Sequence, residues 1–64
     1  MADQAPGDPA AYIIEFVQQG RYVKVTAVDP VSGREAVIVG DPRELREVLE
    51  RNAVNKLKFL LKNK

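Results

Sequence analysis

The stretch that decides the fold is DPRELREVLERNAVNKLKFLLKNK, residues 41–64. Asp41 is a good N-cap, Pro42 suits the first helical position, and Glu44 completes a pattern typical of a capping box. No glycine or proline follows as far as residue 64. The pattern predicts one long helix of about 21 residues and ~32 Å, since an α-helix rises about 1.5 Å per residue.

The apolar side chains of this helix fall into two stripes. At about 100° per residue, one arc holds the side chains that we expect to cover a sheet: Leu45, Val48, Leu49, Ala53, Phe59 and Leu60. A second stripe is expected to point away from the sheet: Val54, Leu57 and Leu61. Because the strands before it are only about 25 Å long, the helix is expected to extend beyond them.

Three runs before the helix have the composition of strands. Residues 11–18 are β-branched and aromatic, and residues 21–29 alternate between the two faces of a strand. The third run, residues 34–40, is apolar on both faces over its part 36–39. Asp29-Pro30-Val31-Ser32-Gly33 between the last two is a strong turn signal. In the third strand we expect Ala36 and Ile38 to point inward.

Gln19 and Gly20 predict a two-residue hairpin loop between the first two strands, with glycine at a positive φ. A longer loop is left open, because glutamine suits this position less well than asparagine or aspartate. The loop predicts five cross-strand pairs: Gln18 with Arg21, Val17 with Tyr22, Phe16 with Val23, Glu15 with Lys24, and Ile14 with Val25. Opposite charges then meet on one face and apolar side chains on the other. The core face is expected to hold Tyr12, Ile14, Phe16, Val23, Val25 and Ala27.

These elements predict one α+β domain over residues 11–64. Its order is β-β-β-α, a three-stranded antiparallel meander with one long C-terminal helix packed on one face. Residues 1–10 hold two prolines and almost no large apolar side chain, so we expect a disordered N-terminal tail.

Composition argues against several kinds of chemistry. The 64 residues include no cysteine and no histidine, which excludes disulfides and removes the commonest metal ligand and general base. The only serine, Ser32, lies in a turn, and the carboxylates are spread over turns, caps and solvent faces. We therefore expect no catalytic residues, no metal, no cofactor and no enzymatic activity.

The same sequence indicates a protein outside the membrane. Its longest apolar runs are far below the ~20 residues of a membrane span. The N-terminus lacks the basic and apolar regions of a signal peptide, and a cytoplasmic location is expected.

A small domain without disulfides or metal often gains stability from a second subunit. Apolar residues on the outer sheet face and on the second helix stripe are more than one helix can cover, and the third strand is an edge without a blocking charge. We predict a non-enzymatic interaction module that forms a homodimer, with exchange of elements between subunits left open. The interface candidates are Ile13, Val17, Tyr22, Val37, Val39, Val54, Leu57 and Leu61; Val28 lies on the same outer face.

Basic residues supply the alternative hypothesis. Residues 51–64 hold five of them and no acid, although the net charge of the chain is only +1. A nucleic-acid-binding module would use phosphate contacts from the helix and the first hairpin. Its candidate residues are Arg21, Lys24, Arg51, Lys56, Lys58 and Lys62.

The run YIIEFVQQGRYVKVTAVDPVSGREAVIVG, followed by a capped helix ending in LKFLLK, resembles a family of short uncharacterised alphaproteobacterial proteins. That family is a domain of unknown function, and the segment VKVTAVDPVSGREAVIVGDP, residues 23–42, is the most specific part of the likeness. The resemblance implies a small bacterial cytosolic protein and brings no site residues. More loosely, the element order is similar to that of single-stranded-DNA-binding coactivators, which have one more strand and a more basic sheet.

Overall fold

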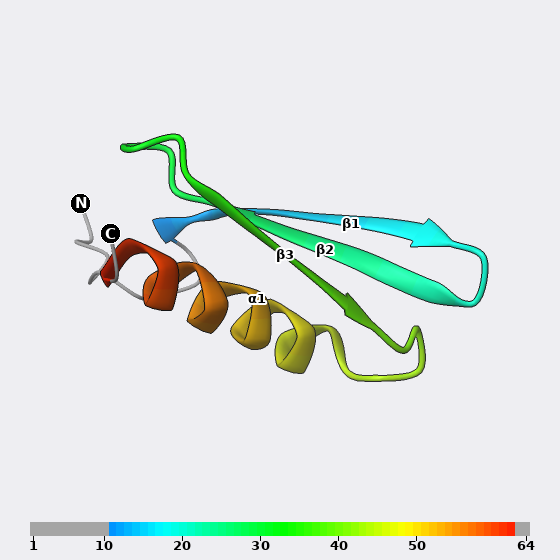
Figure 1. Cartoon of the computed structure of the whole chain (residues 1–64). Helices are drawn as coiled ribbons and strands as arrows, with labels where there is room; N and C mark the ends of the chain where they lie inside the picture. The colour runs from blue at the N-terminus through cyan, green and yellow to red at the C-terminus, as the bar shows by residue number, and fades with distance from the viewer. Residues whose placement is uncertain (1–10, 63–64) are drawn as a thin grey trace.

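Three strands and one helix make up the part of the chain that is described, residues 11–62 of a computed structural model (Figure 1). They are β1 (Ile13–Gln19), β2 (Tyr22–Val28), β3 (Glu35–Gly40) and α1 (Arg46–Lys62). The strands form one antiparallel sheet in the order β1-β2-β3, and α1 packs on one face of it. The predicted fold class and element order are confirmed, whereas the predicted tail, residues 1–10, lies outside the described residues.

The first hairpin turns one residue later than predicted. Gln19 pairs with Tyr22, so the loop is Gly20-Arg21, and Gly20 has a φ of 61°. Glycine at the first loop position with a positive φ is the requirement of a type II′ turn, whose twist suits a hairpin. The five predicted pairs are therefore wrong by two residues along β2, and Phe16 faces Val25 instead of Val23. Because side chains alternate, a shift of two leaves every residue on its predicted face.

The second hairpin follows the prediction more closely. The carboxylate of Asp29 accepts hydrogen bonds from Val31 N–H at 3.0 Å and from the Ser32 hydroxyl at 3.0 Å, which fixes the turn. Across the strands, Ala27 pairs with Ala36 and Val25 with Ile38. Ala36 is buried and Ile38 half-buried, while Val37 and Val39 are exposed, so the inward assignment is confirmed.

The helix begins later than predicted, and Asp41 is not its N-cap. The backbone N–H of Glu44 donates to the carbonyl of Asp41 at 2.9 Å, which closes a separate turn after β3. The first helical carbonyl is that of Leu45, and α1 has 17 residues. Its length is about 25 Å, similar to the ~23 Å of a seven-residue strand. The helix is therefore shorter than the predicted ~32 Å, because the turn takes up residues that the pattern assigned to the helix.

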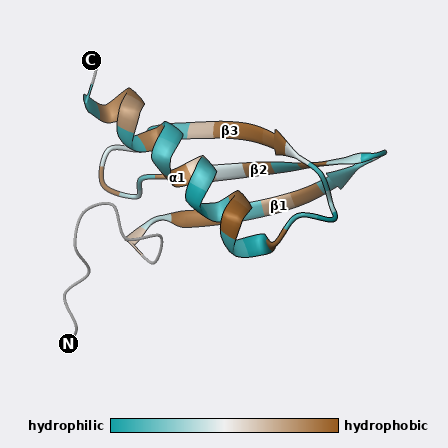
Figure 2. Cartoon of the chain, turned by 90° about the horizontal axis from the view of Figure 1, so that it is seen from below, coloured by the Kyte–Doolittle hydropathy of each residue, from teal (hydrophilic) through white to brown (hydrophobic). Residues whose placement is uncertain are grey.

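The core lies between α1 and the inner face of the sheet. Val25, Ala27, Ala53 and Leu57 are completely buried, and Val54 is 1% exposed. Figure 2 shows α1 crossing the sheet, with hydrophilic residues along much of its outer side. The rest of the buried core consists of Val23, Ala36 and Leu49, with Tyr12, Ile14, Phe16, Ile38, Leu60 and Leu61 packed partly against it.

The buried side of α1 differs from the predicted one. Val54 and Leu57, expected on the far side, are in the core, whereas Leu45 and Phe59 are 67% and 64% exposed. The buried arc is rotated by roughly 100° from the predicted arc, which is about one residue of an α-helix. Both stripes were apolar, so periodicity alone left the rotation undetermined.

Candidate interaction surfaces

The outer face of the sheet carries the predicted apolar residues, but polar side chains interrupt them. Ile13, Val17, Tyr22, Val37 and Val39 are all between 38% and 62% exposed. Lys24 pairs with Val17 on one side and with Val39 on the other. The placement of the five residues on this face is confirmed, while their role at an interface stays a prediction. Lys24 divides the expected patch, which makes this face less suited to a dry interface than a continuous apolar surface.

The second helix stripe is not available at the surface of the monomer. Val54 and Leu57 are buried against the sheet, and Leu61 is half-buried against the same core. The prediction that these three residues lie on a free face is therefore wrong. The physical reason is the rotation of α1, which turns this stripe toward β2 and β3.

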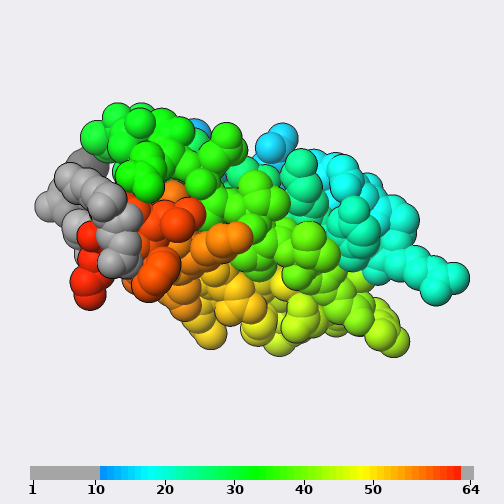
Figure 3. Space-filling view, in the orientation of Figure 1, coloured from blue at the N-terminus to red at the C-terminus, as the bar shows by residue number. Residues whose placement is uncertain are grey.

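Side-chain hydrogen bonds join β3 and the turn before it to the helix, and one of them occupies an outward carbonyl of the β3 edge. Lys56 Nζ donates a hydrogen bond to the backbone carbonyl of Val37 at 2.8 Å, and Arg34 Nη2 donates to the carbonyl of Leu60 at 3.1 Å. Figure 3 shows the atoms of β3, in green, lying directly against those of α1, in yellow and orange. A lysine at a strand edge is a known means of preventing further strand pairing. The β3 edge is thus a poorer interface candidate than its sequence indicates.

The edge of β1 is different, because α1 packs mainly on β2 and β3. Ile14 and Phe16 point to the helix side of the sheet, yet both remain only half-buried. Their neighbours across the ladder, Ala27 and Val25, are completely buried. The core is therefore incomplete along β1.

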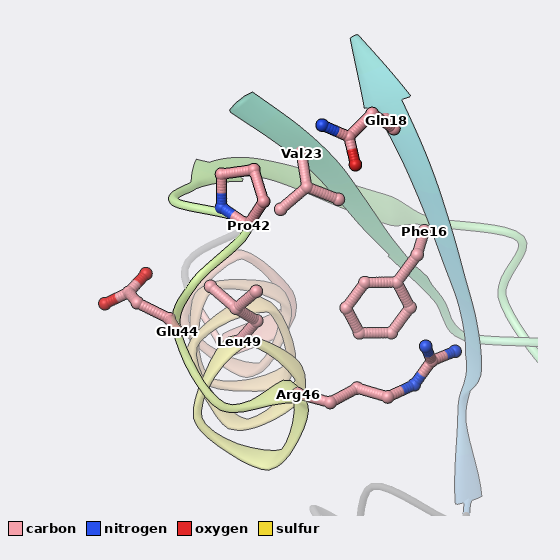
Figure 4. A pocket seen from close by; sticks show the side chains of 7 residues that line it. All are labelled: Phe16, Gln18, Val23, Pro42, Glu44, Arg46 and Leu49. Carbon is pink, nitrogen blue, oxygen red and sulfur yellow. The ribbon is translucent and has the colours of Figure 1, made fainter. Parts of the chain in front are cut away.

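A small cavity lies beside this incomplete part of the core. Its volume is about 280 Å³, at the lower limit of typical ligand pockets. The Arg46 guanidinium carbon lies 4.0 Å from the centre of the Phe16 ring, a cation–π contact that forms one wall. Figure 4 shows the side chain of Glu44 directed away from the cavity. The residues that line it are Phe16, Gln18, Val23, Pro42, Glu44, Arg46 and Leu49.

Sequence reasoning did not identify this cavity. It depends on Arg46 reaching β1 from the first turn of α1, and the helix was predicted to begin several residues earlier. Leu49, which lines the cavity, lies against Gly40 of β3, where a methyl group would overlap Cδ2 of Leu49. The only sequence signal was the alternation that places Phe16 and Gln18 on one face.

The predicted nucleic-acid residues do not come together as one surface. Arg21 lies in the first hairpin loop, Lys24 on the outer sheet face, and Lys56 against β3. The helix places the remaining three on one side, since spacings of seven and four residues return to the same face. Those three, all exposed, are Arg51, Lys58 and Lys62.

The shorter of the two ion pairs found within residues 11–62 lies in the turn before α1. Arg43 Nη2 contacts Asp41 Oδ2 at 2.8 Å, and the Arg43 backbone N–H donates to Oδ1 at 2.9 Å. These bonds, chiefly the one from the guanidinium, hold the pKa of Asp41 below its ordinary value of 3.8. Asp41 N–H also donates to Glu44 Oε1 at 3.3 Å, so the capping-box contacts form in this turn and not at the helix.

Residues 11–62, the described part of the chain, contain neither a metal-binding cluster nor a membrane-spanning helix. The acidic side chains of this region do not gather in threes as metal ligands. The one helix, α1, is too short and too polar to cross a membrane.

Comparison with known proteins gives one positive result. Neither the curated proteins nor the solved structures include a match to this chain. The architectural likeness to single-stranded-DNA-binding coactivators therefore has no structural match behind it. The family model described as "Domain of unknown function (DUF6898)" matches residues 9–64. Since this match covers most of the sequence, the chain belongs to that family of unknown function.

Proposed function

We propose that this chain is a small cytoplasmic, alphaproteobacterial interaction module without enzymatic activity, and that it works as a homodimer. The observation that supports this proposal is the incomplete core along β1. Ile14 and Phe16 face the helix side and stay half-buried, although each is apolar and lies next to a fully buried residue. A second subunit removes such surface from water, at about 25 cal/mol per Å² of apolar area.

The size of the domain supports the same proposal. A chain of about 60 residues buries only ~60% of the surface that its unfolded form exposes, so its stability is marginal. Burial of further apolar residues would therefore add a large fraction to that stability. Disulfide stabilisation is absent here, because the sequence holds no cysteine. Association is the remaining means of stabilisation that this composition favours.

The mass of the chain in solution tests the proposal. Sedimentation equilibrium is expected to give about twice the 7.1 kDa of one chain. The measurement extends to a concentration of about 500 µM, which detects even weak association. A mass of 7.1 kDa over the whole range overturns the proposal.

A second candidate function rests on Arg51, Lys58 and Lys62, which lie on one exposed face of α1. Three phosphate contacts predict a slope of about −2.7 for the logarithm of affinity for double-stranded DNA against the logarithm of salt concentration. Fluorescence anisotropy over a series of salt concentrations that starts at ~50 mM measures this slope, with Lys58→Glu as the test variant and Lys24→Glu, on the opposite face of the sheet, as its control. We favour the homodimer, because only three of the six candidate cations share a surface.

A further inference from the structure

The free edge of β1 presents backbone groups in a regular pattern. The residues that flank a two-residue hairpin loop form a hydrogen-bonded pair, and such pairs alternate along an antiparallel ladder. The odd-numbered residues of β1 therefore bond to β2. The N–H and C=O groups of Ile14, Phe16 and Gln18 point outward, and within residues 11–62 no loop or side chain hydrogen-bonds to them.

This edge lacks the features that prevent strand addition. β1 is seven residues long, contains no lysine or proline, and pairs with β2 without a bulge. Its only charged side chain, Glu15, points to the outer face and leaves the edge itself open. The β3 edge, by contrast, is occupied by Lys56 at the carbonyl of Val37. An unprotected strand of this length is a site for pairing with another strand.

We propose that β1 pairs antiparallel with β1 of a second copy of this chain, with Phe16 opposite Phe16 of that copy. This inference rests on the proposed function and names the surface through which the homodimer forms. The register is centred on Phe16 because Phe16 is the middle residue of Ile13–Gln19, so that all seven residues pair. The result is one continuous six-stranded sheet, three strands from each copy, with both helices on the same face.

The backbone favours this register over its neighbours. With Phe16 at the centre, Ile14 faces Gln18 of the second copy, and all outward groups are used in about six hydrogen bonds. The neighbouring register centred on Glu15 places Glu15 opposite Glu15 of the second copy, and like charges directly opposite each other are destabilising. A register moved the other way centres on Val17 and leaves Ile13 and Ile14 without partners.

The side chains favour it as well. Phe16 lies on the helix side, where it lines the cavity with Arg46 above its ring. The pairing brings the two Phe16 rings together across the twofold axis and covers the half-buried side of the core. Aromatic cross-strand pairs are among the more stabilising pairs in sheets.

Disulfide crosslinking of cysteine variants tests the register of the two β1 strands. The chain has no cysteine of its own that would interfere. In the proposed register Glu15 faces Val17 of the second copy as a non-hydrogen-bonded pair, about 4.5 Å apart at Cα, within disulfide reach. Under oxidation, a mixture of the Glu15→Cys and Val17→Cys chains is expected to form disulfide-linked dimers. Neither variant alone is expected to do so, because its two cysteines lie diagonally at ~7–8 Å.

A second pair of variants tests the edge independently of register. Gln18→Pro removes an outward N–H and leaves the β1–β2 ladder intact, because that N–H is not part of it. Gln18→Ala is the matched control, since both substitutions remove the hydrogen bond from Gln18 Nε2 to the Gly20 carbonyl. We expect loss of the dimer for Gln18→Pro only, with circular dichroism confirming that both variants fold.

The outcomes separate this inference from the proposed function. If the unmodified chain is a monomer, both are wrong. If it is a dimer but Glu15→Cys alone or Val17→Cys alone crosslinks, the register is wrong. If it is a dimer, no combination crosslinks and Gln18→Pro remains dimeric, then β1 is not the interface and the homodimer forms through another surface.

Discussion

Leu57 is the largest side chain that is completely buried between α1 and the sheet. Leu57→Ala is expected to lower the free energy of unfolding by about 2–5 kcal/mol, because it leaves a cavity in a well-packed core. Leu45→Ala is the matched control, since Leu45 is 67% exposed, and a change within about 0.5 kcal/mol is expected. Urea denaturation followed by circular dichroism measures both.

The same pair of leucines shows what the residue pattern left open. The sequence assigns Leu45 to the core and Leu57 to a free stripe, and the structure reverses them. Equal losses of stability for the two alanine variants would contradict the observed rotation of α1. A loss of native signal for Leu57→Ala without denaturant agrees with it, because a domain of this size is marginally stable.

The ionisation of Asp41 is expected to make the stability of the fold depend on pH. Hydrogen bonds from Arg43 lower its pKa in the folded state, so folding favours the charged carboxylate. The resulting stability is present above the ordinary value of 3.8 and is lost as the pH falls through the lowered pKa. Carbon-13 NMR of the carboxyl group is expected to show a midpoint below 3.8 that returns toward 3.8 in Arg43→Ala. An identical midpoint in the two chains would contradict the role of Arg43.

At the scale of elements, the strands were predictable and the start of the helix was not. Alternation and turn residues assign the side chains of β1, β2 and β3 to the correct faces of the sheet, because these signals are local in the sequence. The pattern of Asp41, Pro42 and Glu44 forms its expected hydrogen bonds, but in a turn that the chain needs in order to pass from the sheet to the helix layer. That requirement depends on where α1 packs, and a capping pattern carries no information about it.

Lys56 links α1 to β3, and its removal is an element-scale test. Lys56→Ala is expected to lower the free energy of unfolding by about 0.5–1.5 kcal/mol, the range for one net hydrogen bond. Lys58→Ala is the control, because Lys58 is exposed and two residues away on the same helix. Thermal unfolding compares the two at equal concentration, and a larger effect of Lys58→Ala would contradict the contact with the Val37 carbonyl.

Removing Lys56 also affects the edge that it covers. An uncovered β3 edge is expected to pair with other chains, so Lys56→Ala should form species larger than the proposed dimer, as light scattering would show. Lys58→Ala should not form them. Absence of larger species from both would mean that Lys56 is not what protects β3.

The candidate site belongs to the scale of the whole molecule, which explains why the sequence located it only in part. The excess of apolar residues over what one helix covers was visible in the composition of the strands and of α1. Which apolar residues remain uncovered depends on the position of α1 over β2 and β3 and on its rotation. The structure leaves the core incomplete on the open side of β1, where Phe16 and Ile14 lie, which the sequence does not single out.

If the dimer supplies the missing part of the core, folding and association are one process. The thermal midpoint should then rise with protein concentration, because a tenfold increase favours the folded dimer over two unfolded chains by about 1.4 kcal/mol per mole of dimer. Scanning calorimetry at concentrations that span about two decades measures this dependence. Gln18→Pro is the informative comparison, since a chain with a blocked β1 edge should show a lower midpoint that does not change with concentration. The contrary result is a midpoint that does not change with concentration in the unmodified chain, over a range where its mass is that of a dimer. It would show that folding and association are separate processes and that each monomer folds without its partner.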